Sequence, residues 1–230
     1  MSFRIIFSIL GSLVGLLGLS VVGRRVVQAA RKLRPHPSIH IVGPPAAGKT
    51  TLFRYLRDPS RVDEPRKTFV RRRTGRIAAD FLESHRSWFR SKIIDDGFGR
   101  QTNHWVERLH TYDPEGLIFI VDTHNPDEDQ TYFQDLYNSY RDFGTHAKRV
   151  NLRVLLILLN KFDRWGSTTE SREAMMHRYR SEVCQEVVNR FRSTFGITVQ
   201  FGYSSLTHRE HIPYNNLVVK EFLAVLERKR

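Results

Sequence analysis

The sequence predicts an α/β fold with a mostly parallel six-stranded sheet and helices on both faces, preceded by one transmembrane helix. Three observations predict this. A glycine-rich turn, GPPAAGKT, stands between a strand pattern and a helix pattern. Strand and helix patterns then alternate, as in sheets whose parallel strands are joined by crossover helices. An uncharged apolar run precedes them, which divides the chain into an anchor with a basic segment at 1–34 and an α/β domain at 35–230.

The N-terminal apolar run extends from Ile5 to Gly23 without a charged residue. As a helix it would be roughly 28 Å long, close to the ~30 Å hydrocarbon core of a bilayer. A cleaved signal peptide is the alternative, but no small-x-small cleavage site follows and a basic stretch comes directly after. We therefore expect a retained single-pass anchor that contacts lipid over residues 5–23. Gly11 and Gly15 have the G-x-x-x-G spacing that favours contact with another helix, although lipid-facing small residues give the same pattern.

The charge of the chain limits the kinds of partner that we expect, and its cysteine content limits its possible cross-links. The formal net charge is +13, and the first 34 residues hold six basic residues and no acidic one. Because nearly half of the excess lies beside the apolar run, anionic lipid explains it better than nucleic acid, and no nucleic acid partner is expected. The basic flank, Arg24–Arg34, predicts that the α/β domain is cytosolic. The single cysteine, Cys184, excludes an intramolecular disulfide and is expected to be a small buried side chain.

The elements of the domain follow from short apolar patterns. The expected strands are Ser38–Val42, Gly75–Phe81, Trp88–Asp95, Leu117–Asp122, Val154–Leu159 and Val199–Tyr203. The second and third flank a polar stretch, which predicts an antiparallel hairpin. The fourth and fifth are continuous apolar runs, typical of central strands that are covered on both faces. Helical patterns cover Thr51–Arg57, Asp127–Phe143, Arg172–Phe195 and Leu217–Arg228.

The turn at 43–50 fits the phosphate-binding pattern G-x-x-x-x-G-K-[ST] at each fixed position. Its small residues let successive backbone N–H groups surround phosphate oxygens, and the following helix directs its positive end at the anion. Lys49 would contact the β- and γ-phosphates, and Thr50 would bind Mg²⁺. The residues expected to contact a nucleotide here are Gly43, Pro44, Pro45, Ala46, Ala47, Gly48, Lys49, Thr50 and Thr51.

A second motif, D-x-x-G, follows the third expected strand. Its aspartate is Asp96 and its last residue is Gly99. We expect Asp96 to hold Mg²⁺ through a water molecule and the Gly99 N–H group to contact the γ-phosphate. Asp95 is the alternative for the metal role, because it follows the apolar run more directly. A switch threonine that also binds the metal is expected between the first helix and the hairpin. Thr74 is preferred there, and Thr68 is the other candidate.

Two further motifs are expected to bind the nucleotide base. The sequence NKFD, Asn160–Asp163, follows the fifth expected strand. A carboxylate at Asp163 can accept from both N1–H and the exocyclic amine of guanine, and adenine lacks that pair of donors, so the motif predicts GTP or GDP. Lys161 would cover the base and reach the phosphate loop. After the last strand, the backbone of Ser204, Ser205 and Leu206 would support the guanine carbonyl. An ordinary polar turn can have a similar sequence.

Together these motifs resemble the Ras/Arf superfamily of small GTPases, which are P-loop NTPases, and GLIFIVDT at Gly116–Thr123 resembles the corresponding Arf-type strand. With the anchor, the chain resembles the family of signal recognition particle receptor β subunits. The resemblance implies GTP/GDP and Mg²⁺ as ligands. It assigns GTP hydrolysis to Lys49, Thr74, Gly99, Arg100 and Gln101. Ras-like members place glutamine directly after the D-x-x-G glycine, where this chain has Arg100, so hydrolysis is expected to be slow without a partner.

The leading hypothesis is a membrane-anchored GTP switch that recruits a protein partner through its switch segments, in protein targeting or membrane-linked signalling. The alternative is a non-hydrolysing, GTP-bound scaffold for partner assembly. The basic stretch Arg61–Arg76 overlaps the first switch and is either a solvated loop or a surface for an acidic partner or lipid. The expected location is the endoplasmic reticulum membrane for a eukaryotic receptor-like subunit, and otherwise the bacterial inner membrane.

Overall fold

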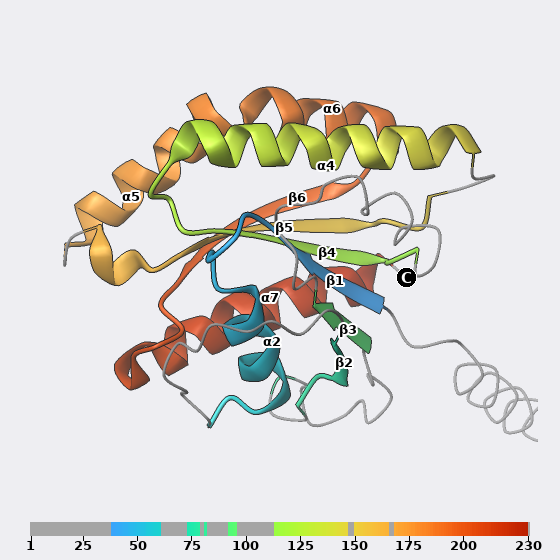
Figure 1. Ribbon diagram of the computed structural model, residues 1–230. Helices are drawn as coiled ribbons and strands as arrows, with labels where there is room; N and C mark the ends of the chain where they lie inside the picture. The colour runs from blue at the N-terminus through green and yellow to red at the C-terminus, as the bar shows by residue number, and fades with distance from the viewer. Residues whose placement is uncertain are drawn as a thin grey trace, which may run out of the picture. The chain divides into compact units, whose positions relative to one another are not determined.

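The computed structural model describes residues 38–60, 73–78, 81, 92–95, 113–146, 150–165 and 168–229. Their sheet has six strands in the order β2-β3-β1-β4-β5-β6 (Figure 1). The strands are β1 Ser38–Val42, β2 Arg73–Arg76, β3 Lys92–Asp95, β4 Gly116–Val121, β5 Val154–Asn160 and β6 Thr198–Ser204. β2 is antiparallel to β3, and every other neighbouring pair is parallel. The prediction of a mostly parallel sheet is confirmed.

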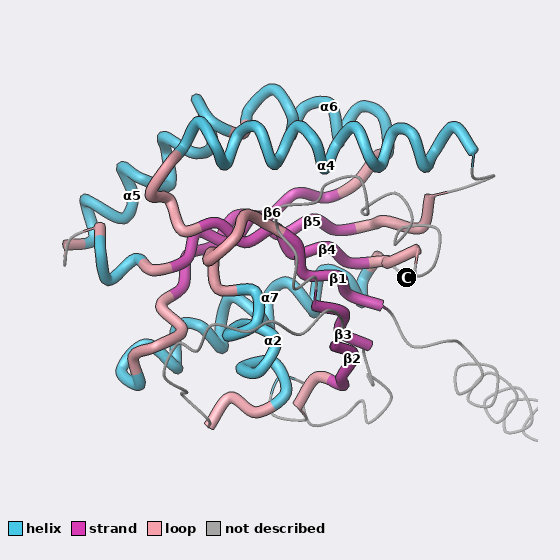
Figure 2. The backbone as a smooth tube through the Cα atoms, in the orientation of Figure 1, coloured by secondary structure: helices cyan, strands magenta, loops and turns pink. Residues whose placement is uncertain are grey.

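Helices cover both faces of this sheet, as predicted. The α-helices are α2 Lys49–Arg57, α4 Pro126–His146, α5 Thr169–Arg178, α6 Gln185–Phe195 and α7 Ile212–Arg228. In Figure 1, α4 and α6 lie on one side of the sheet and α2 and α7 on the other; the tube drawing of Figure 2 shows the same layers. Three short helical segments complete the described fold: η2 Phe162–Arg164, η3 Tyr179–Val183 and η4 Arg209–His211.

The alternation of side chains in the central strands gives each face its own core. In β4, Phe119 packs with Phe133 and Phe191 on the face covered by α4, η3 and α6. Its neighbours Ile118 and Ile120 point the other way and pack with α2 and α7. Every residue of β4 and β5 is buried. Burial on both faces explains why these two strands have no polar alternation in the sequence.

The antiparallel hairpin was predicted correctly as a pair, but its first strand was misplaced. β2 is Arg73–Arg76, whereas the prediction began at Gly75 and ended at Phe81. β3 is described over Lys92–Asp95 and ends where the prediction ended, and the predicted start at Trp88 lies outside the described residues. The apolar residues Ile77 and Phe81 are instead buried beside α2, where Ala78 N–H donates to Leu56 O. Their apolar character reflects packing against that helix rather than strand pairing.

The helix predicted over Arg172–Phe195 is divided. A π-helical turn, η3, separates α5 from α6, and Cys184 lies at the second junction. The buried residues Met176, Tyr179 and Val183 keep a spacing of three or four through the break, so periodicity alone indicated one helix. Cys184 is buried as predicted, and burial raises the pKa of its thiol to about 12.

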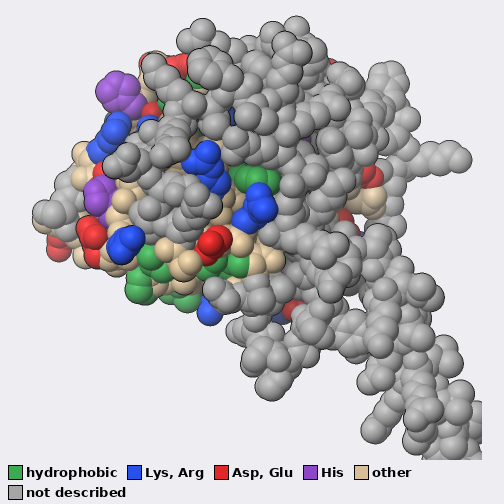
Figure 3. All heavy atoms as spheres, turned by 60° about the horizontal axis from the view of Figure 1, so that its bottom comes forward, with side chains coloured by type: hydrophobic (Ala, Val, Ile, Leu, Met, Phe, Trp, Pro, Cys, Tyr) green, Lys and Arg blue, Asp and Glu red, His purple; other side chains and the backbone are tan. Residues whose placement is uncertain are grey.

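The expected anchor at residues 5–23, with Gly11 and Gly15, lies outside the described residues. Among the helices that the structure does describe, none has the length and apolarity needed to cross a bilayer. On the face turned forward in Figure 3, the described basic, acidic and histidine side chains are interspersed. The positive charge of the chain is therefore not gathered into one patch on the described part of that face.

Candidate functional site

The candidate site lies where four parallel strands end. The phosphate-loop sequence follows β1, Asp122 follows β4, the NKFD sequence begins in the last residue of β5, and the SSL sequence begins in the last residue of β6. Because these strands are parallel neighbours, the segments that follow them meet at one edge of the sheet. Open α/β sheets bind their ligands at this edge.

The phosphate loop has a backbone that needs its glycines. Gly43 has φ of 148° and Gly48 has φ of 105°, and Ala46 is also left-handed at 62°. A Cβ atom at Gly43 would overlap the carbonyl oxygen of Ile120, and one at Gly48 would overlap the Asn160 amide. The loop therefore packs directly on the ends of β4 and β5, which leaves its inner side for a ligand.

Lys49 is the first residue of α2, and its side chain is held by the loop itself. Its ammonium group donates to Gly43 O at 2.8 Å and to Pro44 O at 2.6 Å, and the residue is buried. Thr50 and Thr51 follow in the first turn of α2, both partly exposed. The first helical turn has N–H groups that lack helical acceptors, so this end of α2 is suited to bind an anion.

Asn160, the first residue of NKFD, joins the phosphate loop to the SSL loop that follows β6. Its side-chain amide donates to Ala47 O at 2.8 Å, and its side-chain oxygen accepts from the Ser204 hydroxyl at 3.0 Å. Asn160 and Ser204 are both buried. The sequence placed these residues in two separate motifs. The structure shows that one side chain connects three loops.

Lys161 lies across the site, in the left-handed conformation with φ of 62°. Its ammonium group donates to Ala46 O at 2.9 Å, which is a contact with the phosphate loop; its contact with the base stays a prediction. It also pairs with Asp122 Oδ2 at 3.1 Å. Asp122 was not predicted as a site residue. Its position directly after a buried strand was the signal that could have identified it.

Asp163 is held by the loop after β6. The Ser205 hydroxyl donates to Asp163 Oδ1 at 2.7 Å, and Ser205 Oγ is also 3.0 Å from His208 Nδ1. A hydroxyl has one hydrogen, so His208 must be the donor in the second contact when both bonds form. Within the described part of the chain, no hydrogen bond forms to Asp163 Oδ2. The carboxylate is oriented and still has an oxygen to offer a ligand.

Asn215 fixes the backbone of the SSL loop. Its side-chain oxygen accepts from Ser205 N–H at 3.2 Å, and its side-chain amide donates to Ser205 O at 2.8 Å. Asn215 is buried in α7, and Leu206 is buried in the core beneath the same helix. Asn215 was missed because it lies ten residues from its partner, in the first part of α7, before the predicted helix Leu217–Arg228. No short motif marks it.

A buried acid lies behind the site. Asp129 in α4 accepts from the Tyr179 hydroxyl at 2.6 Å, and both side chains are buried. Burial raises the pKa of the Asp129 carboxyl to about 7, and the bond from Tyr179 partly offsets this. Burial likewise raises the pKa of Tyr179 well above its ordinary value. The pair ties α4 to the π-helical turn, and no sequence pattern indicated it.

Several predicted residues lie outside the described residues: Thr68, Asp96, Gly99, Arg100, Gln101 and most of the basic stretch at 61–76. Two others are described only by their backbone. Thr74 is the second residue of β2, in register with Ile94, and not in the segment before the hairpin where a switch threonine was expected. Asp95 is the last residue of β3. Their roles in metal binding and hydrolysis stay predictions.

The described residues fit a nucleotide better than they fit a metal alone. The loop at 43–50 packs closely on Ile120 and Asn160 through Gly43 and Gly48, and the Lys49 ammonium group lies against its carbonyl groups. Among the residues that the structure describes, no group of three or more acids, histidines or cysteines could hold a metal ion. Thr50 is the described oxygen ligand that suits Mg²⁺, which binds few protein groups and several phosphate or water oxygens.

Comparison with known proteins identifies the fold. No protein-family model and no curated protein matches the chain. The small COPII coat GTPase SAR1 from Encephalitozoon cuniculi, an ADP-ribosylation-factor-like protein in complex with GDP, is 25% identical with a TM-score of 0.50, and the match covers 95% of this chain and 94% of that one. The mammalian SRP receptor is 16% identical with a TM-score of 0.56, over 80% and 99% of the two chains.

The Arl6 BBS3 small GTPase from Trypanosoma brucei, with bound nucleotide analogue GppNp, is 13% identical with a TM-score of 0.52, over 85% of this chain and 100% of that one. The chain therefore has the α/β fold of Ras/Arf-like small GTPases. The likeness extends over nearly the whole length of each of these three structures.

Proposed function

We propose that this protein is a guanine-nucleotide-binding switch of the Ras/Arf-like type. The observation that carries the proposal is that hydrogen bonds connect the loop predicted to bind phosphate with the two segments predicted to bind the base. Asn160 joins Ala47 of the phosphate loop to Ser204 of the SSL loop, and Ser205 orients Asp163. A turn that resembled a phosphate loop by chance would have no reason to share a buried asparagine with an NKFD sequence. Three solved GTP-binding proteins with the same fold support the same reading.

Base selection follows from the chemistry of Asp163. Its carboxylate would accept from N1–H and the exocyclic amine of guanine, and adenine would leave the acid without those donors. The SSL backbone, fixed by Asn215, would support the guanine carbonyl. Lys161 would cover the base while it contacts Ala46 O. ATP is therefore expected to bind much more weakly than GTP.

Phosphate binding would rest on the loop N–H groups, the N-terminal end of α2 and Lys49. Lys49 lies against the loop through Gly43 O and Pro44 O, which places its charge beside the loop N–H groups. When bound, Mg²⁺ would neutralise phosphate charge, with Thr50 as a ligand and Asp96 and Thr74 as the further proposed ones. The Gly99 N–H group would contact the γ-phosphate and so couple the D-x-x-G segment, the second switch, to the bound nucleotide.

The enzymatic activity we propose is slow GTP hydrolysis, which a partner accelerates. Arg100 stands where Ras-like proteins have their water-orienting glutamine, and Gln101 is one residue late. The same observation favours a second function, a GTP-bound scaffold that does not hydrolyse. Single-turnover hydrolysis with and without the partner separates the two. A partner that accelerates hydrolysis supports the switch, and a rate above about one per minute by the chain alone contradicts the proposed role of Arg100.

We further propose that residues 5–23 anchor the protein as a single-pass membrane protein with its α/β domain in the cytosol, where the switch segments meet a protein partner. The uncharged run and its basic flank support this. Alkaline carbonate extraction of membranes tests the anchor, because an integral protein stays in the pellet. The partner is sought by affinity capture with the membrane-extracted chain loaded with GppNp, against the GDP-loaded chain as control.

The nucleotide assignment is tested by Asp163→Asn. The amide would offer the base a donor in place of an acceptor, so the variant should lose affinity for GTP and gain affinity for xanthosine triphosphate. Lys49→Ala should weaken both nucleotides alike, because it acts on the phosphates. Unchanged GTP affinity in Asp163→Asn would refute the base assignment. Equal binding of ATP and GTP by the unmodified chain would refute the proposed function.

A further inference from the structure

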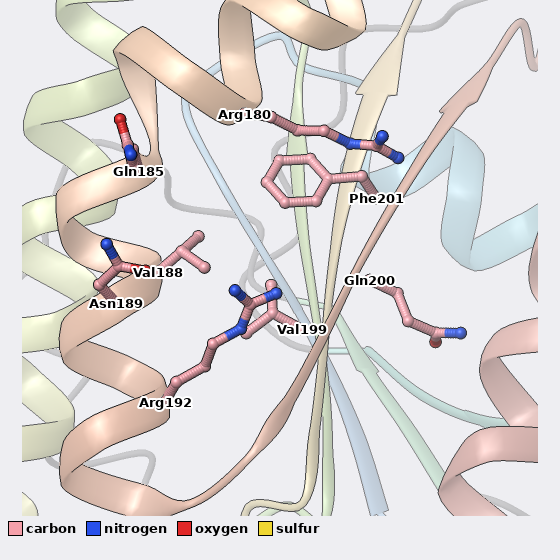
Figure 4. Close-up of a pocket in the computed structure, with 8 residues that line it drawn as sticks. All are labelled: Arg180, Gln185, Val188, Asn189, Arg192, Val199, Gln200 and Phe201. Carbon is pink, nitrogen blue, oxygen red and sulfur yellow. The ribbon is translucent and has the colours of Figure 1, made fainter.

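A second site lies away from the nucleotide loops, beside the edge strand β6. An open pocket of about 510 Å³ is formed by α6, the end of η3 and the strand itself. Its lining includes Arg180, Arg192, Val199 and Phe201 (Figure 4). The figure shows Arg180 extending over the Phe201 ring and Arg192 extending from α6 towards the strand at Val199. Two cations therefore border a pocket whose lining combines the apolar side chains of Val188, Val199 and Phe201 with the amides of Gln185, Asn189 and Gln200.

These two arginines differ from the arginines two residues before them. Arg178 pairs with Glu182 at 3.7 Å, and Arg190 pairs with Glu186. Among the residues that the structure describes, neither Arg180 nor Arg192 has an ion pair. The guanidinium carbon of Arg180 lies 5.2 Å from the centre of the Phe201 ring, which holds the charge over the pocket. The pocket thus offers two guanidinium groups to an anionic ligand.

The strand beside the pocket has an unpaired edge within the described sheet, because β6 is its last strand. Thr198 N–H donates to Arg153 O at 2.9 Å, so Thr198 directs its backbone groups towards β5. Backbone direction alternates along a parallel strand. The N–H and C=O groups of Val199 and Phe201 therefore point to the open edge, where an added strand would find both a donor and an acceptor.

The two cations lie beside strand residues that are two positions apart. Val199 and Phe201 are two residues apart, which corresponds to roughly 6.6 Å along a strand. Arg180 lies at Phe201 and Arg192 extends towards Val199. Side chains at positions i and i+2 of an added strand lie on the same face with the same separation. Acidic side chains at these two positions would each meet one guanidinium group.

We propose that β6 and this pocket bind an acidic peptide segment as an added strand, with carboxylates two residues apart on Arg180 and Arg192. The backbone edge favours a peptide over a phosphate or a lipid headgroup, because a peptide has N–H and C=O groups at the regular spacing of a strand and can pair with both Val199 and Phe201. Charged partners would add charge-assisted hydrogen bonds to the backbone pairing. The site shares no residue with the nucleotide loops and does not depend on their function.

The test uses the full chain in detergent micelles and a fluorescent, end-capped peptide of alternating glutamate and valine, with binding measured by anisotropy. Arg180→Glu and Arg192→Glu should each raise the Kd by about tenfold or more, because each replaces an attraction by a repulsion. Lys220→Glu is the matched control: it makes the same charge change at an exposed position of α7 and should change the Kd less than twofold. Amide exchange at Val199 and Phe201 should slow when the peptide binds.

Two comparisons separate strand addition from simple charge attraction. A peptide with the same glutamates but N-methylated amides at alternate positions keeps the charge and loses the backbone donors, so it should bind at least tenfold more weakly. Equal binding of the methylated peptide would overturn the proposal. Displacement of the peptide by millimolar inorganic phosphate or by phosphatidylserine vesicles, with no slowing of exchange at Val199 and Phe201, would overturn it in favour of an anion or lipid site.

Discussion

The two ends of the nucleotide site are built in different ways. The phosphate end depends on backbone shape: Gly43, Ala46 and Gly48 all have positive φ, and added Cβ atoms at the two glycines would meet neighbouring strands. The base end depends on side-chain hydrogen bonds, with Ser205 on Asp163 and Asn215 on the Ser205 backbone. The first end should therefore be sensitive to added atoms, and the second to lost polar atoms.

The largest effect should come from Gly43→Ala. The new Cβ atom would overlap Ile120 O, a backbone atom that cannot move without disturbing β4, and φ of 148° is unfavourable for alanine. Strain and overlap together should lower the free energy of unfolding by about 3–5 kcal/mol, measured by urea denaturation. Gly196→Ala is the control, because it also has positive φ but no atom within 4 Å. It should cost about 1 kcal/mol, from strain alone.

A cost at Gly43 no larger than at Gly196 would contradict the close approach of the phosphate loop to β4. It would also remove the distinction between the two ends, because the loop would then tolerate an added atom. The difference between the two variants, rather than either value alone, measures the overlap.

Asn160→Ala should have the next largest effect, because this residue belongs to both ends. It would leave Ala47 O and the Ser204 hydroxyl without their partners in a buried place. We expect a loss of about 2–4 kcal/mol in the free energy of unfolding. Ser204→Ala removes one of the two bonds and should cost about 1 kcal/mol. If the two variants cost the same, the bond to Ala47 does not connect the ends.

The sequence predicted more of the phosphate end than of the base end, for physical reasons. A phosphate loop is a local backbone shape, so the residues that make it, from Gly43 to Thr50, are consecutive and form a recognisable pattern. The partners of the base end come from distant segments, and Asp122 and Asn215 have no fixed spacing to the residues they hold. The same reason explains the π-helical turn and the pair of Asp129 with Tyr179, which depend on packing between helices.

Fold prediction shows the same contrast. β4 and β5 were placed to within one residue at each end, because burial on both faces makes the apolar run continuous. The hairpin strand β2 was displaced, because the apolar residues that follow it, such as Ile77 and Phe81, pack against a helix instead. Apolar character predicts burial. It predicts a strand only where nothing else can cover the residue.

Asn215→Ala tests the base end alone. It would remove the partners of both Ser205 backbone groups, so we expect a loss of about 1–3 kcal/mol in stability. If the proposed function is right, GTP affinity should also fall by roughly tenfold, because the loop that supports the base is no longer fixed. Asn216→Ala is the control next to it on α7. Its side-chain oxygen accepts from the Tyr55 hydroxyl at 2.6 Å, away from the SSL loop, so GTP affinity should not change.

The smallest effect should come from Asp122→Asn, at the point where the two ends meet. Lys161 pairs with Asp122 while it donates to Ala46 O, and both members of the pair are more than a fifth exposed. The amide oxygen could still accept from Lys161, so only the charge is lost, and partly exposed pairs contribute less than about 1 kcal/mol. The difference in unfolding free energy should shrink further in 1 M NaCl, because salt screens the pair. A larger cost that salt leaves unchanged would show that Asp122 acts by shape, as the phosphate end does, and not by charge.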